Sequence, residues 1–168
     1  MEIYILRHAI AAPRSRTRYP DDRRRPLTRE GKEKMRDIAR AMEKMDLGFD
    51  LILSSPYLRA SQTAVLAATI LRAEKLLKYS KHLGSAGDPK ALVKELAGLP
   101  VSKKRVALVG HEPYLSELIS MLVTGSSTAL SLTLKKGGLG KMSVTRLKYG
   151  RCATLEWLLT PKQLIAMS

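Results

Sequence analysis

Two histidines and two arginines have the residue types and positions that an enzyme acting on phosphate would use. Arg7 and His8 follow an apolar run near the start of the chain, and His111 follows a second apolar run. Arg59 stands a few residues after a third such run. Arginine presents a planar fork of N–H donors that matches phosphate oxygens, and neutral histidine is a good nucleophile near neutral pH. Together they indicate phosphoryl transfer, in which positive groups balance the charge that develops at phosphorus.

Short apolar runs alternate with amphipathic stretches along the chain, which predicts an α/β fold in one domain, residues 1–168. We expect strands at Ile3–Leu6, Asp50–Leu53, Leu76–Tyr79, Val106–Val109, Ser131–Leu134, Lys141–Leu147 and Ala153–Leu159. We expect helices to begin at Thr28, Ser55-Pro56, Asp88-Pro89 and Pro113, a turn at 136–140, and a long loop at 9–26. Ser55 is expected to act as an N-cap, with Pro56 as the first helical residue. If the first, second and fourth strands are neighbours in a parallel sheet, the histidines and arginines meet at one edge.

Each of these residues has an ordinary interpretation when it is taken singly. His8 and His111 could be hydrogen-bonded core histidines at strand ends, and Arg59 could be a surface arginine of a helix. Ser54, Ser55 and Thr63 could be mistaken for nucleophiles, but the chain has no Gly-x-Ser-x-Gly element. The combination of motifs favours the functional interpretation over the ordinary one.

Four motifs occur in a fixed order over roughly the first two thirds of the chain. They are Arg7-His8-Ala9, Leu27-Thr28-Arg29-Glu30-Gly31, the eleven residues from Ser54 to Ala64, and Gly110-His111. The set resembles the signatures of the histidine phosphatase superfamily. That resemblance implies a phosphoglycerate mutase-like fold, with three α/β/α layers and a mostly parallel central sheet. The short chain and its Gly-His-Glu-Pro sequence look most like the SixA-type phosphohistidine phosphatase branch.

The resemblance also implies a mechanism and an assignment of roles. His8 attacks phosphorus in line, and water then hydrolyses the phospho-His8 intermediate, which is covalent catalysis. Arg7, Arg59 and His111 hold the phosphoryl oxygens, and Ser55 is expected beside them in the substrate site. The superfamily needs no metal or other cofactor, and three histidines with one cysteine do not form a metal-ligand pattern.

A general acid is the part that the sequence leaves open. Many members of the superfamily take a glutamate from an inserted loop that has no counterpart in this chain. The candidates are Asp88, Glu112, Asp21 and Asp22, and Glu112 could instead cap the helix that follows it. An alcohol leaving group needs a proton in the transition state, whereas imidazole, with a pKa near 6.5, needs less help. A missing acid therefore favours phosphohistidine as the substrate and argues against a mutase.

The chain carries a net charge of +15, from 30 Lys and Arg against 15 Asp and Glu. Such a charge attracts anions, and part of it is concentrated in the loop residues Arg14, Arg16, Arg18, Arg23, Arg24 and Arg25. We expect this loop to rim the pocket and to recruit an acidic partner protein or a highly phosphorylated substrate. Aromatic residues make up only 5% of the chain, which disfavours nucleic acid as the partner.

The expected function is hydrolysis of phosphohistidine on a phosphorylated protein. One alternative is a phosphatase for small phosphate esters or polyphosphates, and another is a non-catalytic module that binds phosphate or nucleic acid. Early charges argue against a signal peptide, and no apolar run is long enough for a membrane span. The lone Cys152, interpreted as a small buried residue near a strand, fits a cytoplasmic setting, and His82 is interpreted as structural or exposed.

Overall fold

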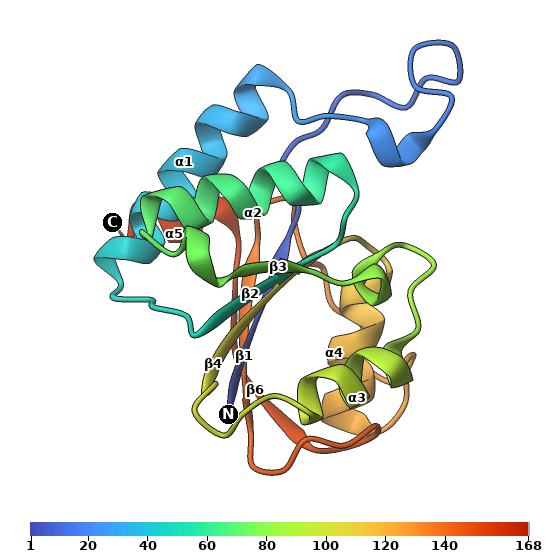
Figure 1. Ribbon diagram of the computed structural model, residues 1–168, viewed down its shortest axis with the longest axis vertical. Helices are drawn as coiled ribbons and strands as arrows, with labels where there is room; N and C mark the ends of the chain where they lie inside the picture. Colours follow the sequence, from blue (N-terminus) through green and yellow to red (C-terminus); the bar gives the residue numbers. More distant parts are fainter. Residues whose placement is uncertain (168) are drawn as a thin grey trace.

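The computed structural model describes residues 1–167, and these form a three-layer fold around a six-stranded sheet (Figure 1). The strands are β1 (Glu2–Arg7), β2 (Leu51–Ser54), β3 (Leu77–Tyr79), β4 (Arg105–Gly110), β5 (Leu139–Val144) and β6 (Ala153–Leu159). Their order across the sheet is β3-β2-β4-β1-β5-β6. Strands β3, β2, β4 and β1 are parallel to one another, whereas β5 is antiparallel to both β1 and β6. The expected mostly parallel sheet is confirmed.

Helices cover both faces of this sheet (Figure 1). The α-helices are α1 (Arg29–Lys44), α2 (Leu58–Ile70), α3 (Pro89–Ala97), α4 (Tyr114–Thr124) and α5 (Pro161–Ala166), and the short 3-10 helices are η1 (Asp22–Arg24), η2 (Glu74–Leu76) and η3 (Lys81–Leu83). Helices α1, α2 and α5 contribute to one apolar cluster, and α3 and α4 contribute to the other. The expected three-layer α/β/α architecture is therefore confirmed.

Strand β1 shows why the sheet lies between two apolar layers. Tyr4 and Leu6 belong to the cluster under α1 and α2, and Ile3 and Ile5 belong to the cluster under α3 and α4. Successive side chains of a strand point to opposite faces, so a strand covered on both faces must be apolar throughout. All four residues are buried, and the strand can therefore hold its last residues rigidly at the sheet edge.

Two of the expected helix starts are confirmed by their caps. Thr28 Oγ1 accepts a hydrogen bond of 2.9 Å from Gly31 N, which closes the first turn of α1. Asp88 Oδ1 accepts from the backbone N–H groups of Lys90 and Ala91 at the start of α3. A capping oxygen satisfies backbone donors that have no partner inside the helix, which is why Thr and Asp recur at these positions.

The expectation that Ser55 caps α2 is wrong. The helix begins at Leu58, and its N-cap residue Tyr57 makes no side-chain cap hydrogen bond. Ser55 N donates to Val109 O at 2.9 Å, so the chain is still bonded to β4 at this point. The backbone of Ser55 therefore still pairs with β4, and its Oγ accepts a hydrogen bond of 3.3 Å from Tyr57 N ahead of the helix.

The C-terminal third also differs from the sequence expectation. The segment 131–134 forms no strand, and β5 runs over Leu139–Val144 instead of Lys141–Leu147. The expected turn at 136–140 is shorter, because Leu139 and Gly140 already pair with β1. Helix α5 was not expected, although Thr160 and Gln163 form a capping box, which is a recognisable helix start.

Three isolated expectations can be compared with the described residues. His82, interpreted from the sequence as structural or exposed, lies half-buried in η3. Cys152 is half-buried where burial was expected, and it lies just before β6, with its Sγ donating to Lys148 O at 3.1 Å. Among residues 1–167, the structure has no helix whose length and apolar character would suit it to crossing a membrane.

Candidate active site

The sheet register brings the two histidine motifs together at one edge. Arg7 pairs with Gly110 across β1 and β4, and Ser54 pairs with Val109 across β2 and β4. The residues that directly follow β1, β4 and β2 at this edge are His8, His111 and Ser55. The ring centroids of His8 and His111 are 5.2 Å apart. The convergence expected from the sequence is therefore what the structure shows.

His8 is held in one orientation by two backbone carbonyl groups. Its backbone N–H donates to Gly110 O at 3.0 Å, and its ring Nδ1 lies 2.8 Å from Ala9 O. A carbonyl oxygen can only accept, so the ring hydrogen must be on Nδ1. The lone pair is then on Nε2, which has no hydrogen-bond partner within residues 1–167. The ring thus presents an unprotonated nitrogen.

Burial and positive neighbours keep both histidine rings uncharged. Burial lowers the pKa of His8 to about 3, and the charges of Arg59, Arg7 and Arg25 act in the same direction, although the hydrogen bond to Ala9 opposes them. Burial and the Arg59 charge likewise lower the pKa of His111 to about 3. An ordinary histidine is partly protonated near neutral pH. Here both rings are neutral there, which is the form that can donate an electron pair.

Arg7, Arg59 and His111 each have one buried side-chain nitrogen that makes no hydrogen bond within residues 1–167. Arg7 Nη1 donates to Leu134 O at 2.8 Å, and Arg59 binds Asp22 through Nη1 to its carbonyl oxygen and Nη2 to its carboxylate. The Nε atoms of both arginines and Nδ1 of His111 are buried without a partner. Buried donors that lack an acceptor are costly, so these groups suit an oxygen-rich anion.

Ser55, which was expected among the substrate-binding residues, contacts His111. Its Oγ lies 2.9 Å from His111 Nε2, and both side chains are buried. Tyr57, which the sequence analysis missed, lies against two residues of the site, His111 and Arg59. Its ring centroid is 5.0 Å from that of His111, and Arg59 Cζ is 5.5 Å from the Tyr57 ring. An aromatic residue inside the Ser54 to Ala64 motif was the available signal.

Thr63 and Gln62 of the same motif hold the segments that carry the site residues together. Thr63 Oγ1 accepts from Ala9 N at 3.0 Å and donates to Arg59 O at 2.7 Å. It therefore ties the residue after His8 to the helical turn that carries Arg59. Gln62 Oε1 accepts from Leu27 N at 2.8 Å and so links this helix to the second motif. Sequence reasoning weighed Thr63 only as a nucleophile and did not find this role.

The four acid candidates lie in different surroundings. Asp88 caps α3, and Glu112 contacts both Ser116 N and Ser116 Oγ in the first turn of α4. Asp21 is paired with Arg23, which lowers the pKa of its carboxyl group. Of the four, Asp22 alone bonds a proposed phosphate-binding residue in this structure. Partial burial acts to raise its pKa, but the hydrogen bond from Arg25 and the charge of Arg59 lower it overall.

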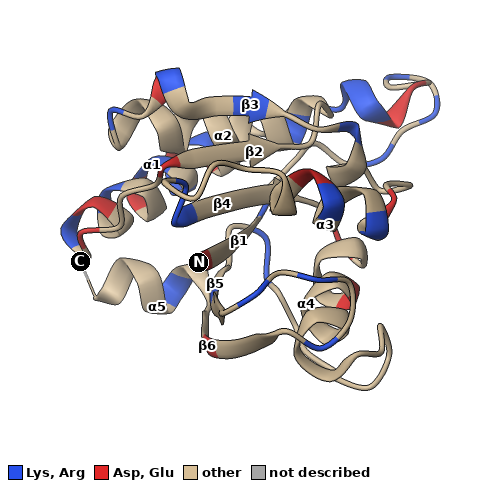
Figure 2. Ribbon diagram, turned by 60° about the horizontal axis from the view of Figure 1, so that its bottom comes forward, with Lys and Arg blue, Asp and Glu red and all other residues tan. Residues whose placement is uncertain are grey.

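The arginines of the loop before α1 divide into two groups. Arg14, Arg16, Arg18, Arg23 and Arg24 are exposed, and this loop projects from the body of the fold (Figure 2). Arg25 is buried, donating from Nε to Asp22 at 2.9 Å and from Nη1 to Ala12 O at 2.8 Å. Because Asp22 in turn binds Arg59, Arg25 helps to position Arg59 and is not one of the exposed arginines of the loop.

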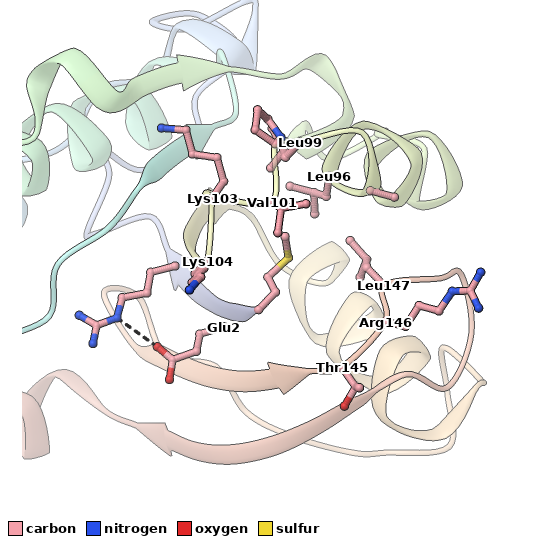
Figure 3. A pocket seen from close by; sticks show the side chains of 13 residues that line it. Glu2, Leu96, Leu99, Val101, Lys103, Lys104, Thr145, Arg146 and Leu147 are labelled. Carbon is pink, nitrogen blue, oxygen red and sulfur yellow. Dashed lines mark ion pairs between the residues drawn. The ribbon is translucent and has the colours of Figure 1, made fainter.

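Other places in the described residues suit this chemistry less well. A cavity of about 840 Å³ lies at the opposite end of the sheet, lined by Lys103, Lys104 and Arg146 around leucine side chains (Figure 3). Its lining has no histidine or cysteine to act as a nucleophile. Residues 1–167 contain no cluster of three or more His, Cys, Asp or Glu that could hold a metal ion.

Comparisons with known proteins point to one family. The sequence profile of the histidine phosphatase superfamily (branch 1) matches residues 3–78. An uncharacterised protein of Picosynechococcus sp. (strain ATCC 27264 / PCC 7002 / PR-6) is 38% identical over 141 residues, which cover 83% of this chain and 82% of the relative. Phosphohistidine phosphatase SixA of Escherichia coli (strain K12) is 27% identical over 165 residues, which cover 90% of this chain and 99% of SixA.

The fold comparison agrees with the sequence matches. The structure of the protein histidine phosphatase SixA complexed with tungstate superimposes with a TM-score of 0.81 at 24% identity, covering 98% of this chain and 99% of that one. The two proteins therefore share a fold. With the superfamily profile and the relatives in agreement, this chain belongs to the histidine phosphatase superfamily and is a phosphatase.

Proposed function

We propose that this phosphatase hydrolyses phosphohistidine on proteins through a covalent phospho-His8 intermediate. The observation that carries the proposal is the state of His8, whose Nδ1 donates to Ala9 O while its Nε2 keeps a free lone pair. The low pKa of this ring keeps that lone pair available at neutral pH. Similarity to the phosphohistidine phosphatase SixA supports the choice of substrate.

The reaction has two displacement steps at phosphorus. His8 Nε2 attacks the phosphoryl group, a P–N bond to His8 forms, and the P–N bond of the substrate breaks with its electron pair going to the leaving imidazole. The other ring nitrogen of the substrate carries a proton when the bond breaks, so the leaving group departs as neutral imidazole and takes no proton from a general acid. A water molecule then attacks phospho-His8, so that orthophosphate leaves and His8 returns to its starting form. Two such steps replace one difficult hydrolysis with two easier transfers.

Arg7, Arg59 and His111 bind the phosphoryl oxygens in this proposal. Their buried, unpartnered N–H groups support it, because phosphoryl oxygens are the acceptors that such donors lack. Charge on the equatorial oxygens grows toward the transition state, so donors fixed in place beforehand lower the barrier. Ser55 acts through His111, whose ring it contacts on the Nε2 side.

The state of the acid candidates supports a leaving group that needs little protonation. The lowered pKa values of Asp21 and Asp22 leave both carboxylates ionised at neutral pH, and an ionised carboxylate has no proton to give. Asp88 and Glu112 are engaged at helix starts. An imidazole leaving group, with a pKa near 6.5, departs far more readily than an alkoxide. This comparison favours phosphohistidine over an alcohol ester.

The test compares phosphate release from a phosphohistidine-bearing protein and from p-nitrophenyl phosphate, with wild type, His8→Ala and His82→Ala assayed side by side. The expected result is rapid release from phosphohistidine, slower release from the ester, loss of both with His8→Ala, and no loss with His82→Ala. Equal or faster turnover of the ester would instead indicate a phosphatase for small phosphate esters or polyphosphates. No turnover of either substrate would overturn the enzymatic proposal in favour of a binding module.

A further inference from the structure

A second basic hollow adjoins the site and shares Arg7 with it. It has a volume of about 480 Å³, and four lysines line it together with Arg7: Lys34, Lys135, Lys136 and Lys162. We call this set of residues the lysine hollow. A volume in this range is typical of ligand-binding clefts and exceeds what one phosphate group would fill.

The fold places the lysine hollow at the same sheet edge as the histidines. Lys135 and Lys136 precede β5, and the next two residues bond the backbone of Arg7, with Gly137 N donating to Arg7 O and Arg7 N donating to Gly138 O. Lys162 lies in the first turn of α5, directly after β6. Arg7, which directly precedes His8, is therefore hydrogen-bonded through its backbone to the segment that carries Lys135 and Lys136.

The lysines of the hollow have no internal counter-charge. Within residues 1–167, none of the four side chains makes a hydrogen bond or an ion pair, and no Asp or Glu lines the hollow. Grouped like charges repel one another, and the repulsion is relieved when an anion enters. By contrast, the acidic residues near the Arg59 side of the site are already paired with arginines.

We propose that the lysine hollow binds acidic side chains that flank the phosphohistidine of a protein substrate. This inference rests on the proposed function. Arg7 lines the hollow and also belongs to the site around His8. One substrate can therefore place its phosphoryl group beside His8 and an acidic side chain in the hollow. Ile10 and Pro161 also line the hollow and offer apolar contact to side-chain methylenes, which suits a peptide better than bare phosphate.

The test uses two phosphohistidine peptides that differ only in the flanking residues, Asp and Glu in one and Asn and Gln in the other. The hollow variant carries Lys135→Ser, Lys136→Ser and Lys162→Ser. The matched control carries Lys75→Ser, Lys94→Ser and Lys104→Ser, which removes the same charge outside the hollow. At low salt, the wild type and the control should prefer the acidic peptide in kcat/KM by about tenfold, and the hollow variant should show a ratio near one.

Three results would overturn the proposal: no preference in the wild type, a retained preference in the hollow variant, or an equal loss of preference in the control. If neither peptide is hydrolysed, the proposed function fails and the hollow is tested separately. Inorganic tripolyphosphate is then titrated calorimetrically against the same three proteins. Weaker binding in the hollow variant alone supports an anion site that free polyphosphate can fill, and unchanged binding in that variant overturns the site.

Discussion

Ser55 Oγ lies 2.9 Å from His111 Nε2 and is the only hydrogen-bond partner of that ring within residues 1–167. The same Oγ accepts from Tyr57 N at 3.3 Å, so its hydroxyl hydrogen is available to the histidine. Donation to Nε2 places the ring hydrogen of His111 on Nδ1, which is buried and unpaired. In that arrangement Nδ1 is the nitrogen of His111 that can donate to a phosphoryl oxygen.

Replacing Ser55 with Ala should lower kcat/KM by roughly 5-fold to 150-fold, which is the effect of losing about 1–3 kcal/mol of buried hydrogen bonding. The ring of His111 can then adopt either tautomer, so part of the population offers no N–H to the substrate. Steady-state kinetics on the phosphohistidine substrate measure the change, with Ser61→Ala as the control. Unchanged kcat/KM in a folded Ser55→Ala protein would show that Ser55 has no such role.

The free energy of unfolding should fall as the pH is lowered from about 6.5. His8 and His111 have pKa values lowered from 6.5 to about 3 in the folded protein. The unfolded chain therefore binds more protons between those values, and each histidine reduces stability by up to about 1.4 kcal/mol per pH unit in that window. Urea unfolding at pH 7, 6 and 5 measures the change in the free energy of unfolding per pH unit. These pH values lie above the range where carboxylates titrate.

The matched comparison for this slope is the His82→Gln protein, which keeps both buried histidines. It should lose stability with falling pH as steeply as the wild type. The His8→Gln protein should show a shallower slope, since only one buried histidine remains. A stability that is constant from pH 7 to 5 in the wild type would contradict the low pKa values.

The fall in kcat/KM at acidic pH should occur well below the pKa of an ordinary histidine. His8 attacks only in its neutral form, and kcat/KM reports the ionisation of the free enzyme. With a His8 pKa of about 3, kcat/KM should not decline around pH 6.5 as the pH is lowered. A pH series with a buffer of constant ionic strength tests this, with the ionisation of the substrate measured in parallel. An enzyme-derived acid limb near 6.5 would show that His8 titrates normally.

Gly31 should be intolerant of a side chain. A Cβ at this position would lie 2.0 Å from Ile10 O, because the start of α1 passes directly over the segment after His8. Gly31→Ala should destabilise the protein by about 1–3 kcal/mol, the usual effect of forcing atoms into a packed region. Gly98→Ala is the control, since its Cβ would meet only ordinary contacts at 3.5 Å or more. Thermal unfolding of both variants decides whether the close approach matters.

The exposed arginines of the loop before α1 should affect recruitment and not the chemical step. Replacing Arg14, Arg23 and Arg24 with Ser should reduce kcat/KM for an acidic phosphoprotein at low salt and flatten its salt dependence. Arg25 is left in place because it is buried against Asp22 and Ala12. Assays at low and high ionic strength test the idea. The same kcat/KM and salt dependence as the wild type would contradict recruitment by this loop.

Parts of the site followed from local sequence because they obey local rules. The apolar run before Arg7-His8 predicts a buried strand, and a strand end is where its next side chains can meet a ligand. The capping residues Thr28 and Asp88 predict the starts of α1 and α3 for the same local reason. Ser55 shows the limit, since its cap signal was overruled by a backbone bond to Val109 on a strand far away in sequence.

The sequence alone determined the family signatures, the α/β class, and the presence of two histidines and two arginines with phosphate chemistry. Tertiary structure decided how they are used. Only the packed fold shows that Ser55 contacts His111, that Arg25 is buried while its neighbours are exposed, and that Lys135 and Lys162 line one hollow. Motifs and periodicity follow from local propensity, whereas these contacts join residues distant in sequence and depend on strand order and register, which local patterns do not encode.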